Sequence, residues 1–321
     1  NSADSTNRNL TVATGGNTVH INFDGIVGEG EGLGAIALTG VLDLNAAIAD
    51  ANSLTVSGST ALDADVTTSG TQTYTSVALG TGARTLEGSI IQTITIDGGQ
   101  NLTITGNLDS NGNIGSNTPI GVFEVSGTSN FAANVLTSGT QTYSGAVTLG
   151  ANIVFTSSND NFTFSSTVDS DSSTRNLTLN AGSGTIGISN AVGGGEAIGT
   201  LTITQSGGVT FSGNINAAIV TLTDTTNSVT FAGNTVLTTL NTASQDYNVV
   251  FTGSTNTITN AVTFSNTGFV TFGNASGDSS TFNGGLTTTA PSQVNVGGTL
   301  QTSTDAMSLG DANTAIVLVA N

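Results

Sequence analysis

A short motif that returns every 20 residues constrains the fold of this chain most strongly. Val-Thr-Phe-Ser-Gly-Asn begins at Val209, and related segments begin at Val229 and Val249, with a further copy at Val270. Between the copies lie segments in which Val, Ile and Leu alternate with Thr. Such alternation predicts half-buried strands, and the Gly and Asn residues between them predict turns.

A unit of this length contains only two or three short strands, which cannot bury their apolar side chains without neighbours. Stacked units can, because each strand pairs in parallel with its equivalent one coil further on. We therefore predict an all-β fold, a parallel β-solenoid formed by one chain, with about 20–23 residues per coil. Phe211, Phe231 and Phe251 are expected to stack in one interior row. An antiparallel β-sandwich, which also has short Thr- and Val-rich strands, remains the alternative.

The corners of such a solenoid are expected to be rich in Gly and Asn because tight turns often need a positive φ angle. A helix is conceivable only at the Ala-rich segment 45–51. Its match at residues 216–222 runs directly into β-branched residues, so both segments are predicted to be strand or turn.

A longer repeat overlies the short one. Residues 5–12 resemble residues 173–179, Val27-Gly28 resembles Val192-Gly193, and Asn45–Ile48 resembles Asn216–Ile219. The element Thr-Ser-Gly-Thr-Gln-Thr-Tyr occurs twice, at residues 68–74 and 137–143. We predict one continuous β-solenoid over residues 1–321, with two approximate super-repeats, about 5–80 and 172–253, and a related middle segment.

Charge and composition exclude several classes of function. The formal net charge is −18, with three Lys plus Arg residues, so a basic patch for nucleic acid or for anionic lipid is not expected. No apolar run approaches the length of a membrane-spanning helix, which predicts no membrane insertion. The chain has no Cys and therefore no disulfide. Hydrophobic residues make up 36%, more than a disordered chain would contain.

Three segments resemble the repeat regions of large secreted bacterial proteins, namely Thr140–Gly150, Arg175–Asn180 and Gly199–Thr204. The similarity is to filamentous-haemagglutinin-type adhesins and giant autotransporter-like surface proteins, and it covers roughly residues 8–300. It implies a right-handed parallel β-helix, export, and a structural role outside the cell or at its surface. It carries over no catalytic residues. Such proteins are longer and have an N-terminal secretion domain, so the resemblance leaves open whether this chain is a fragment or a processed subunit.

Few residues are candidates for catalysis. His20 is the only histidine and would have to act as the base of a Ser-His-Asp triad, but it lies in an alternating strand pattern. Glycoside hydrolysis needs two carboxylates about 5 to 9.5 Å apart. Asp63 with Asp65, and Asp169 with Asp171, have suitable spacing, yet neither pair has a neighbouring Trp, Lys or Arg in the sequence. We interpret them as solvated corner aspartates and predict no enzymatic activity and no cofactor.

Calcium is the one metal that the sequence leaves open. Asp109, Asn111 and Asn113 follow the spacing at the start of a calcium loop, although the Glu expected at position twelve is Ile120. Asp169 and Asp171 form a second group of hard oxygen ligands. A plain turn is the competing interpretation at both places.

These observations favour a non-enzymatic extracellular structural protein, a rod-like subunit of a surface fibre that assembles head to tail. An adhesin stalk that presents loops to a surface or glycan ligand is the alternative, and a β-helical glycan-active enzyme is a third. The apolar run at residues 315–320 either tucks inside its own solenoid or pairs with the first coils of a second copy. The predicted assembly residues are Ile316, Val317, Leu318 and Val319 on one side and Leu10, Val12, Val19 and Ile21 on the other.

Overall fold

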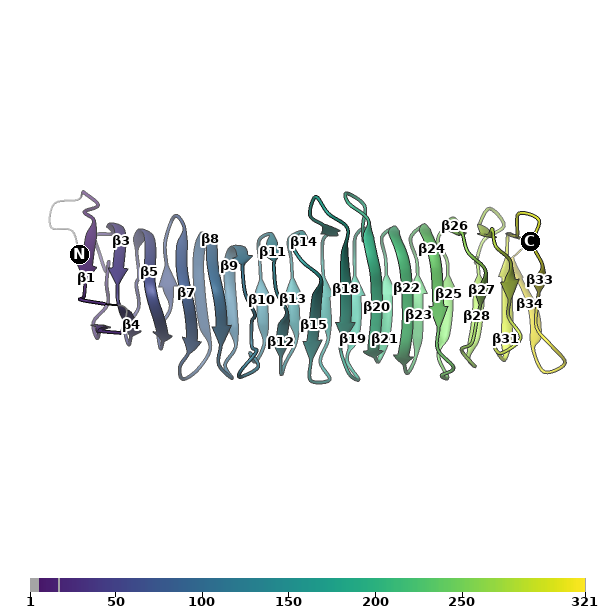
Figure 1. Cartoon of the computed structure of the whole chain (residues 1–321), viewed down its shortest axis with the longest axis horizontal. Helices are drawn as coiled ribbons and strands as arrows, with labels where there is room; N and C mark the ends of the chain where they lie inside the picture. The colour runs from purple at the N-terminus through teal and green to yellow at the C-terminus, as the bar shows by residue number, and fades with distance from the viewer. Residues whose placement is uncertain (1–5, 17, 321) are drawn as a thin grey trace. The chain divides into compact units, whose positions relative to one another are not determined.

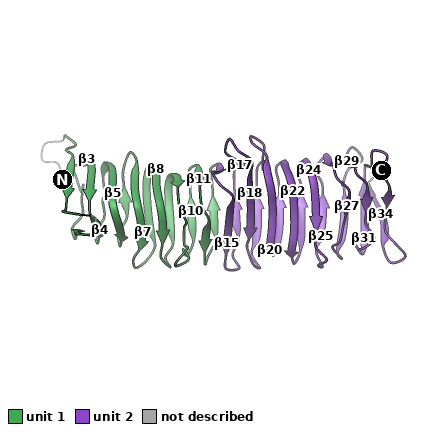
Figure 2. Cartoon of the chain, viewed as in Figure 1, with its two compact units in different colours: residues 1–145 green, residues 146–321 purple. Residues whose placement is uncertain are grey.

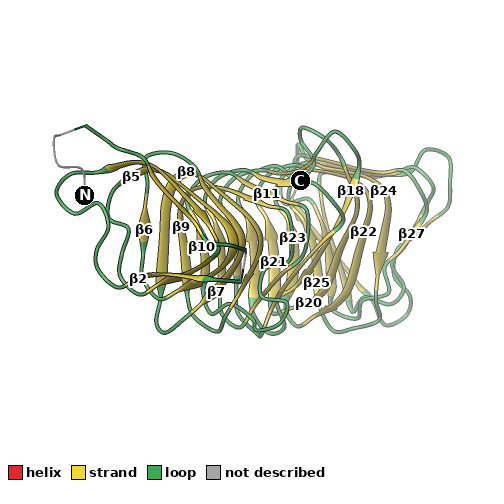
Figure 3. Cartoon of the chain, turned by 60° about the vertical axis from the view of Figure 1, so that its left-hand side comes forward, coloured by secondary structure: helices red, strands yellow, loops and turns green. Residues whose placement is uncertain are grey.

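A computed structural model describes residues 6–16 and 18–320 of the chain (Figure 1). The chain is an all-β parallel solenoid of about 15 turns with about 20 residues per turn, and the described residues contain no helix (Figure 3). Strands pair in parallel with the equivalent strand one coil on, for example Ile36 with Leu54 and Val220 with Leu240. This confirms the predicted fold class and excludes the antiparallel sandwich.

The chain divides into two compact units, residues 1–145 and residues 146–321 (Figure 2). The strands of unit 1 are β1 (Leu10–Ala13), β2 (His20–Phe23), β3 (Leu33–Thr39), β4 (Val41–Leu44), β5 (Ala51–Leu62), β6 (Val66–Thr67), β7 (Gln72–Leu79), β8 (Arg84–Asp97), β9 (Leu102–Ser110), β10 (Phe123–Val125), β11 (Ser129–Phe131), β12 (Val135–Thr137) and β13 (Gln141–Tyr143).

The strands of unit 2 are β14 (Val147–Leu149), β15 (Ile153–Ser157), β16 (Phe162–Phe164), β17 (Val168–Ser170), β18 (Arg175–Asn180), β19 (Thr185–Ile188), β20 (Ile198–Ser206), β21 (Gly208–Phe211), β22 (Ile215–Thr225), β23 (Ser228–Phe231), β24 (Thr235–Thr242), β25 (Asn248–Phe251), β26 (Thr255–Ile258), β27 (Val262–Thr263), β28 (Phe269–Phe272), β29 (Ser279–Phe282), β30 (Leu286–Thr287), β31 (Gln293–Gly297), β32 (Thr299–Gln301), β33 (Met307–Ser308) and β34 (Ala315–Ala320).

The repeated Val-Thr-Phe motif forms the most regular part of unit 2. Val209 lies beside Val229 in the next coil, and Val229 beside Val249. The rings of Phe211 and Phe231 stack with centroids 5.3 Å apart and planes at 19°, and those of Phe231 and Phe251 with centroids 4.8 Å apart and planes at 9°. The predicted interior row of three phenylalanines is confirmed.

Each coil in this region contributes side chains to three inward-facing rows that continue from one coil to the next. Ile215, Val220 and Phe231 are all buried, and each lies beside a partner in the following coil. Neighbouring residues alternate between the interior and the outer surface, as the period of two in a strand requires. The apolar half of the alternating sequence therefore fills the interior, and the Thr, Ser and Asn half faces outward.

The element at residues 68–74 forms a polar network inside the core. Gln72 is fully buried, and its Nε2 donates hydrogen bonds to the Oγ1 of Thr68 at 3.3 Å and to the carbonyl oxygen of Glu87 at 2.7 Å. The hydroxyl of Tyr74 donates to the Oε1 of Gln72 at 2.8 Å. In the second copy of the element, Nε2 of Gln141 donates to the Oγ1 of Thr137 at 3.0 Å, and the hydroxyl of Tyr143 donates to the Oε1 of Gln141 at 2.8 Å, as in the first. Burial of these polar groups is tolerated because their hydrogen bonds are satisfied.

The asparagines at the corners do not act as the sequence predicts. Among the described residues, Asn159 is the only residue other than glycine with a positive φ. The corner asparagines and aspartates instead use their Oδ1 atom to accept the backbone N–H of a residue 18 to 26 positions later, in the next coil. We call them the bridging Asx residues: Asn9, Asp63, Asp65, Asp97, Asn101, Asn107, Asn113, Asn152, Asn159, Asn161, Asp169, Asn176, Asn214, Asn234 and Asn248.

Glycine does supply the positive φ angles. Gly28 has φ +83° and Gly193 has φ +70°, and at each a Cβ atom would lie 2.1 Å from a carbonyl oxygen of the next coil. Val27 and Val192, which precede them, each make a single parallel bridge to the following coil. These segments, which the sequence matches to each other, therefore have the same local structure. Residue 5, where the first predicted super-repeat begins, lies outside the described residues, and the single continuous domain stays a prediction.

The two Ala-rich segments contain no helix. Residues 45–50 connect β4 to β5, and Asn216–Leu222 lies within β22. Both follow the prediction of strand or turn.

Candidate functional site

The apolar run at residues 315–320 forms β34, which pairs in parallel with β31 of the same unit. Leu318 lies beside Val296 and Ile316 beside Val294, so both side chains extend the inward row of that face. Leu318 is nevertheless 73% exposed and Ile316 46% exposed. Val317 and Val319, on the outward side of β34, are also exposed, as are Met307 and Leu309 nearby in the sequence. β34 therefore pairs with its own solenoid, but apolar side chains on both of its faces remain exposed to solvent.

In the first described coil of unit 1, apolar side chains are also incompletely covered. Leu10 and Val12 of β1 lie beside Ile36 and Leu38 of β3. Ile36 and Leu38 are buried, whereas Leu10 and Val12 are only half-buried. Within the described part of the chain, β3 is the strand that pairs with β1, and β31 the strand that pairs with β34. Each of the two strands therefore has one edge that no described strand covers.

The other two residues predicted for the assembly site lie close to β1 in the sequence. Ile21 is buried within β2, and Val19, just before β2, is exposed. Ile21 pairs with Leu42 of β4, so it already forms part of the interior. Of the predicted assembly residues in unit 1, Leu10, Val12 and Val19 thus retain accessible apolar surface.

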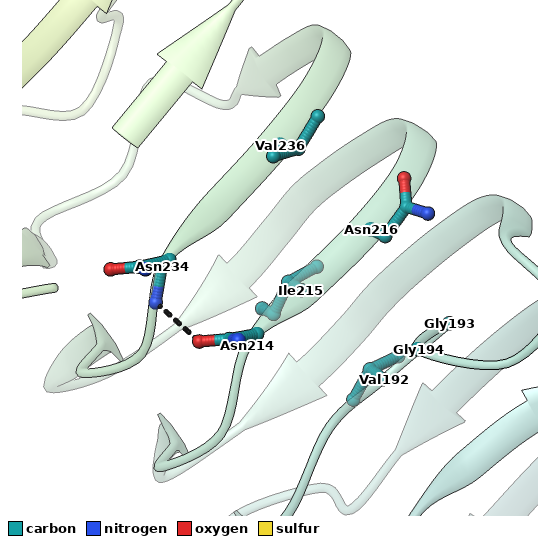
Figure 4. Close-up of a pocket in the computed structure, with 8 residues that line it drawn as sticks. All are labelled: Val192, Gly193, Gly194, Asn214, Ile215, Asn216, Asn234 and Val236. Carbon is teal, nitrogen blue, oxygen red and sulfur yellow. Dashed lines mark hydrogen bonds between the residues drawn. The ribbon is translucent and has the colours of Figure 1, made fainter. Parts of the chain in front are cut away.

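A shallow groove of about 380 Å³ lies on the outer surface of unit 2 (Figure 4). Asn216 and Val236 also line an adjoining hollow of about 230 Å³, and the side chain of Val236 is 55% exposed. The backbone N–H of Asn234 donates to the Oδ1 of Asn214 at 2.9 Å, which joins two coils at one margin of the groove. The lining carries no ionisable side chain, so it suits an uncharged ligand rather than acid–base chemistry. The groove residues are Val192, Gly193, Gly194, Asn214, Ile215, Asn216, Asn234 and Val236.

Three of the four aspartates considered for glycoside hydrolysis are bridging Asx residues. Asp63 accepts the backbone N–H of Thr81 at 2.9 Å, and Asp65 accepts that of Thr85 at 2.9 Å. Asp169 accepts the backbone N–H of Gly195 at 2.8 Å. Their carboxylates act inside the fold as hydrogen-bond acceptors between coils.

The fourth, Asp171, has a basic neighbour, so the prediction that no arginine lies near these pairs is wrong. Nε of Arg175 lies 2.9 Å from Oδ1 of Asp171, and Nη2 lies 2.7 Å from Oδ2, with both side chains 29% exposed. The hydrogen bond from Arg175, together with one from the backbone of Ser173, lowers the pKa of Asp171. A carboxyl group with a lowered pKa is a poor proton donor near neutral pH, unlike the general acid of a glycosidase.

His20 forms a pair with Asp43 on the neighbouring strand β4. Its Nδ1 lies 2.5 Å from the Asp43 Oδ2, and the histidine side chain is 61% exposed. A His–Asp pair can orient an imidazole, but a triad also needs a hydroxyl nucleophile on the other ring nitrogen. Among residues 6–16 and 18–320, Asp43 is the hydrogen-bond partner that the structure gives His20.

The calcium candidates are also engaged in hydrogen bonds between coils. Oδ1 of Asp109 accepts a hydrogen bond from Nδ2 of Asn130 at 2.9 Å, and Oδ1 of Asn113 accepts one from the backbone N–H of Asn134 at 3.2 Å. Asn111 is exposed, and its backbone N–H donates to the carbonyl oxygen of Thr93. The described residues contain no group of three or more His, Cys, Asp or Glu side chains placed to hold a metal ion. Calcium binding stays a prediction from the sequence pattern.

Comparisons with protein-family models, curated proteins and solved structures found no match. The resemblance to repetitive bacterial surface proteins therefore stays a prediction. Within residues 6–16 and 18–320, no helix has the length and apolar character required to span a membrane. The function must be inferred from the residues of the chain itself.

Sequence reasoning missed two features that organise the molecule. The sequence shows the repeated Thr–Gln–Tyr element as a motif, but the buried hydrogen-bond network that it forms was not predicted. A Gln that lies two residues before a Tyr, between apolar positions, could have indicated that network. From the sequence, the corner asparagines are expected to serve turn geometry, and Asp63, Asp65 and Asp169 to be solvated, whereas the structure uses them to join coils. Their recurrence close to the coil length, for example at Asn214 and Asn234, could have indicated contacts between coils.

Proposed function

We propose that this chain is a non-enzymatic structural protein outside the cell, a building block of a surface fibre in which copies associate end to end. The observation that carries the proposal is the exposed apolar strand β34, where Leu318 is 73% exposed although it continues an interior row. A strand edge that no described strand covers can accept a further strand in parallel.

The two free edges are complementary. β34 offers a parallel strand edge with Ile316 and Leu318 on its inward side, and β1 offers one with Leu10 and Val12 on its inward side. Pairing them satisfies backbone N–H and C=O groups and removes four apolar side chains from water. The contact uses different surfaces on the two partners, so it does not close on itself and generates a filament.

The distribution of cationic residues supports a location exposed to proteases. The chain has only three Lys plus Arg residues, which are the cleavage sites of trypsin-like enzymes. Arg84 and Arg175 both lie on strands. The Arg84 guanidinium donates to the carbonyl oxygens of Leu62 and Ala83, and that of Arg175 forms the ion pair with Asp171. Strands held in this way are poor protease substrates because cleavage requires local unfolding.

The carboxylates support a structural role. Asp63, Asp65 and Asp169 are used to join coils, and Asp171 is paired with Arg175. A glycosidase needs one carboxyl group that stays protonated and another that is free to act on the sugar. The arrangement of these four groups favours a scaffold over a hydrolase.

The outer groove supports a second candidate, an adhesin stalk that binds a neutral glycan or other uncharged polymer. Asn216 offers an amide and Val236 an apolar surface in the same hollow. Binding of neutral glycans that is lost on Val236→Asp, in a chain that forms no fibres, would favour this candidate.

The fibre proposal is tested with a truncation and a point variant. The full chain is expected to form fibres visible by negative-stain electron microscopy and to sediment as large particles, whereas a chain truncated after Thr314 stays monomeric. Leu318→Asp should also prevent assembly, because it places a charge in the apolar contact. Val236→Asp is the matched control, since Val236 is an exposed strand valine far from β34 in the sequence. Fibres from the truncated chain or from Leu318→Asp in wild-type yield would refute the proposal.

A further inference from the structure

Glycine recurs at one position opposite the bridging Asx residues. At seven of them, the residue immediately before the accepted backbone N–H is a glycine of the next coil. At all seven, a Cβ atom added to that glycine would lie against the Oδ1 atom of the Asx side chain. We call these the Asx–Gly pairs: Asn9 with Gly34, Asp63 with Gly80, Asn101 with Gly121, Asn107 with Gly127, Asn159 with Gly182, Asn176 with Gly199, and Asn248 with Gly268.

Backbone conformation explains only one of these seven glycines. Gly182 has a φ in the left-handed region, at +57°. The other six have a φ outside the region that favours glycine, so their conformation does not demand it. What all seven share is an Oδ1 atom in the space that a Cβ atom would need.

We infer that each Asx–Gly pair acts as one unit that positions a coil on the preceding coil. The glycine leaves the space into which the Oδ1 atom reaches, and this atom accepts the N–H that follows the glycine. A side chain at the glycine position would displace Oδ1 and break the hydrogen bond. The pairs therefore fix which residue of the next coil lies over the Asx side chain, although corner lengths place that residue 18 to 26 positions later.

The pair of Asn176 and Gly199 shows the arrangement most clearly. Gly199 and Thr200 lie at a register shift between β18 and β20, opposite the single residue Asn176. Oδ1 of Asn176 accepts the N–H of Thr200 at 2.8 Å. A Cβ atom on Gly199 would lie 2.5 Å from this Oδ1, and the next nearest atom, Cγ2 of Thr174, would be 3.2 Å away. The Asn176 side chain is thus what a larger residue at position 199 would displace.

Bridging Asx residues without a paired glycine show that the hydrogen bond alone does not require one. Oδ1 of Asn234 accepts the N–H of Thr255 at 3.0 Å, with Ser254 immediately before it. The Ser254 hydroxyl donates to the same Oδ1 atom at 3.0 Å. Glycine should therefore be needed only where Oδ1 occupies the Cβ position, so the cost of replacing it should depend on the Asx residue.

A double-mutant cycle on Asn176 and Gly199 tests this dependence, with exchange of the Thr200 amide hydrogen as the measurement. Gly199→Ala alone and Asn176→Ala alone should each speed this exchange about threefold to tenfold, because each change removes the same hydrogen bond. In the Asn176→Ala background, Gly199→Ala should cause no further acceleration, since alanine no longer meets Oδ1 and restricts the unfolded chain. Asn176→Asp keeps the acceptor, so Gly199→Ala should still speed exchange in that background.

Gly187→Ala is the matched control. Gly187 lies on β19, and the nearest atom to an added Cβ would be 3.9 Å away, so this variant should leave exchange of the Thr200 amide unchanged. The proposal is overturned if Gly199→Ala speeds exchange equally with and without the Asn176 side chain. It is also overturned if Gly199→Ala has no effect in the otherwise unsubstituted chain.

The pair of Asp63 and Gly80 gives an independent test in unit 1, which decides the matter if variants of the first pair do not fold. The three atoms nearest to a Cβ added at Gly80 all belong to the Asp63 carboxyl group, which accepts the N–H of Thr81. Gly80→Ala should speed exchange of the Thr81 amide, and it should cause no further acceleration once Asp63→Ala is present. Additive effects of the two substitutions would contradict the proposed unit.

Discussion

Replacing Phe231 by alanine should weaken the middle of the phenylalanine row selectively. The Phe231 ring is fully buried between two others, 5.3 Å from the Phe211 ring centroid and 4.8 Å from that of Phe251. Truncating a buried Phe to Ala costs about 3–5 kcal/mol, and stacked ring pairs contribute about 0.5–1.5 kcal/mol each beyond burial. The flanking strands are held in register on both sides, so the cavity cannot easily collapse. We expect a loss of about 4 kcal/mol.

The effect should be local, because each coil of a solenoid contacts only its neighbours. Native-state hydrogen exchange of β21, β23 and β25 is therefore a better assay than a single melting temperature. A loss of about 4 kcal/mol corresponds to roughly thousandfold faster exchange of the amides that open with these coils. Peptides from residues 33–62 should exchange at the wild-type rate.

Phe269→Ala is the matched control, because Phe269 lies on the outward side of β28 and is only half-buried. Its removal should cost about 1 kcal/mol, or roughly fivefold in exchange. If Phe231→Ala accelerates exchange no more than Phe269→Ala does, the row of rings does not stabilise the coils as argued. Equal acceleration in β3 and β5 would refute the local character of the effect.

Three further predictions concern other parts of the chain. Burial raises the pKa of all three tyrosines, that of Tyr247 to about 12. The stability they contribute should be complete below pH 10 and lost as the pH rises toward 12, and tyrosinate absorbance of the folded protein should show no ionisation step near pH 10. Asn234→Ala should cost about 1–2 kcal/mol in urea unfolding, because it removes the acceptor of two hydrogen bonds, whereas Asn234→Asp retains the acceptor and should cost less than about 0.5 kcal/mol. The chain should turn over no substrate on a polysaccharide panel, and activity that disappears on Asp63→Asn or Asp169→Asn would contradict this.

The core could be predicted from the sequence because its signal is periodic. Val209, Val229 and Val249 recur at the coil length, and the structure stacks them together with Phe211, Phe231 and Phe251. For the apolar run at residues 315–320 the sequence left two alternatives open, and the structure pairs it as β34 with β31 of the same solenoid while Leu318 stays 73% exposed. Periodicity identifies which positions are equivalent, and equivalent positions must meet when coils stack.

The polar contacts could not be predicted in the same way. The bridging Asx bonds span 18 residues at Asp63 but 26 residues at Asn9, because corner lengths differ from coil to coil. A single insertion in a corner changes which backbone N–H lies opposite a given side chain. The ion pair of Asp171 with Arg175 could not be predicted from the spacing of the two residues, because the path of the turn between β17 and β18 decides whether their side chains meet.

The sequence by itself determined that the chain stacks as parallel coils. A 20-residue unit cannot bury its apolar residues alone, and the return of one motif at a constant interval favours stacked parallel coils over an antiparallel sandwich. Only the tertiary structure decided which polar groups join one coil to the next, and which carboxylates are thereby used. A hydrogen bond depends on distances of a few tenths of an ångström between atoms far apart in the chain, and those distances exist only once the corners have closed and the coils are stacked.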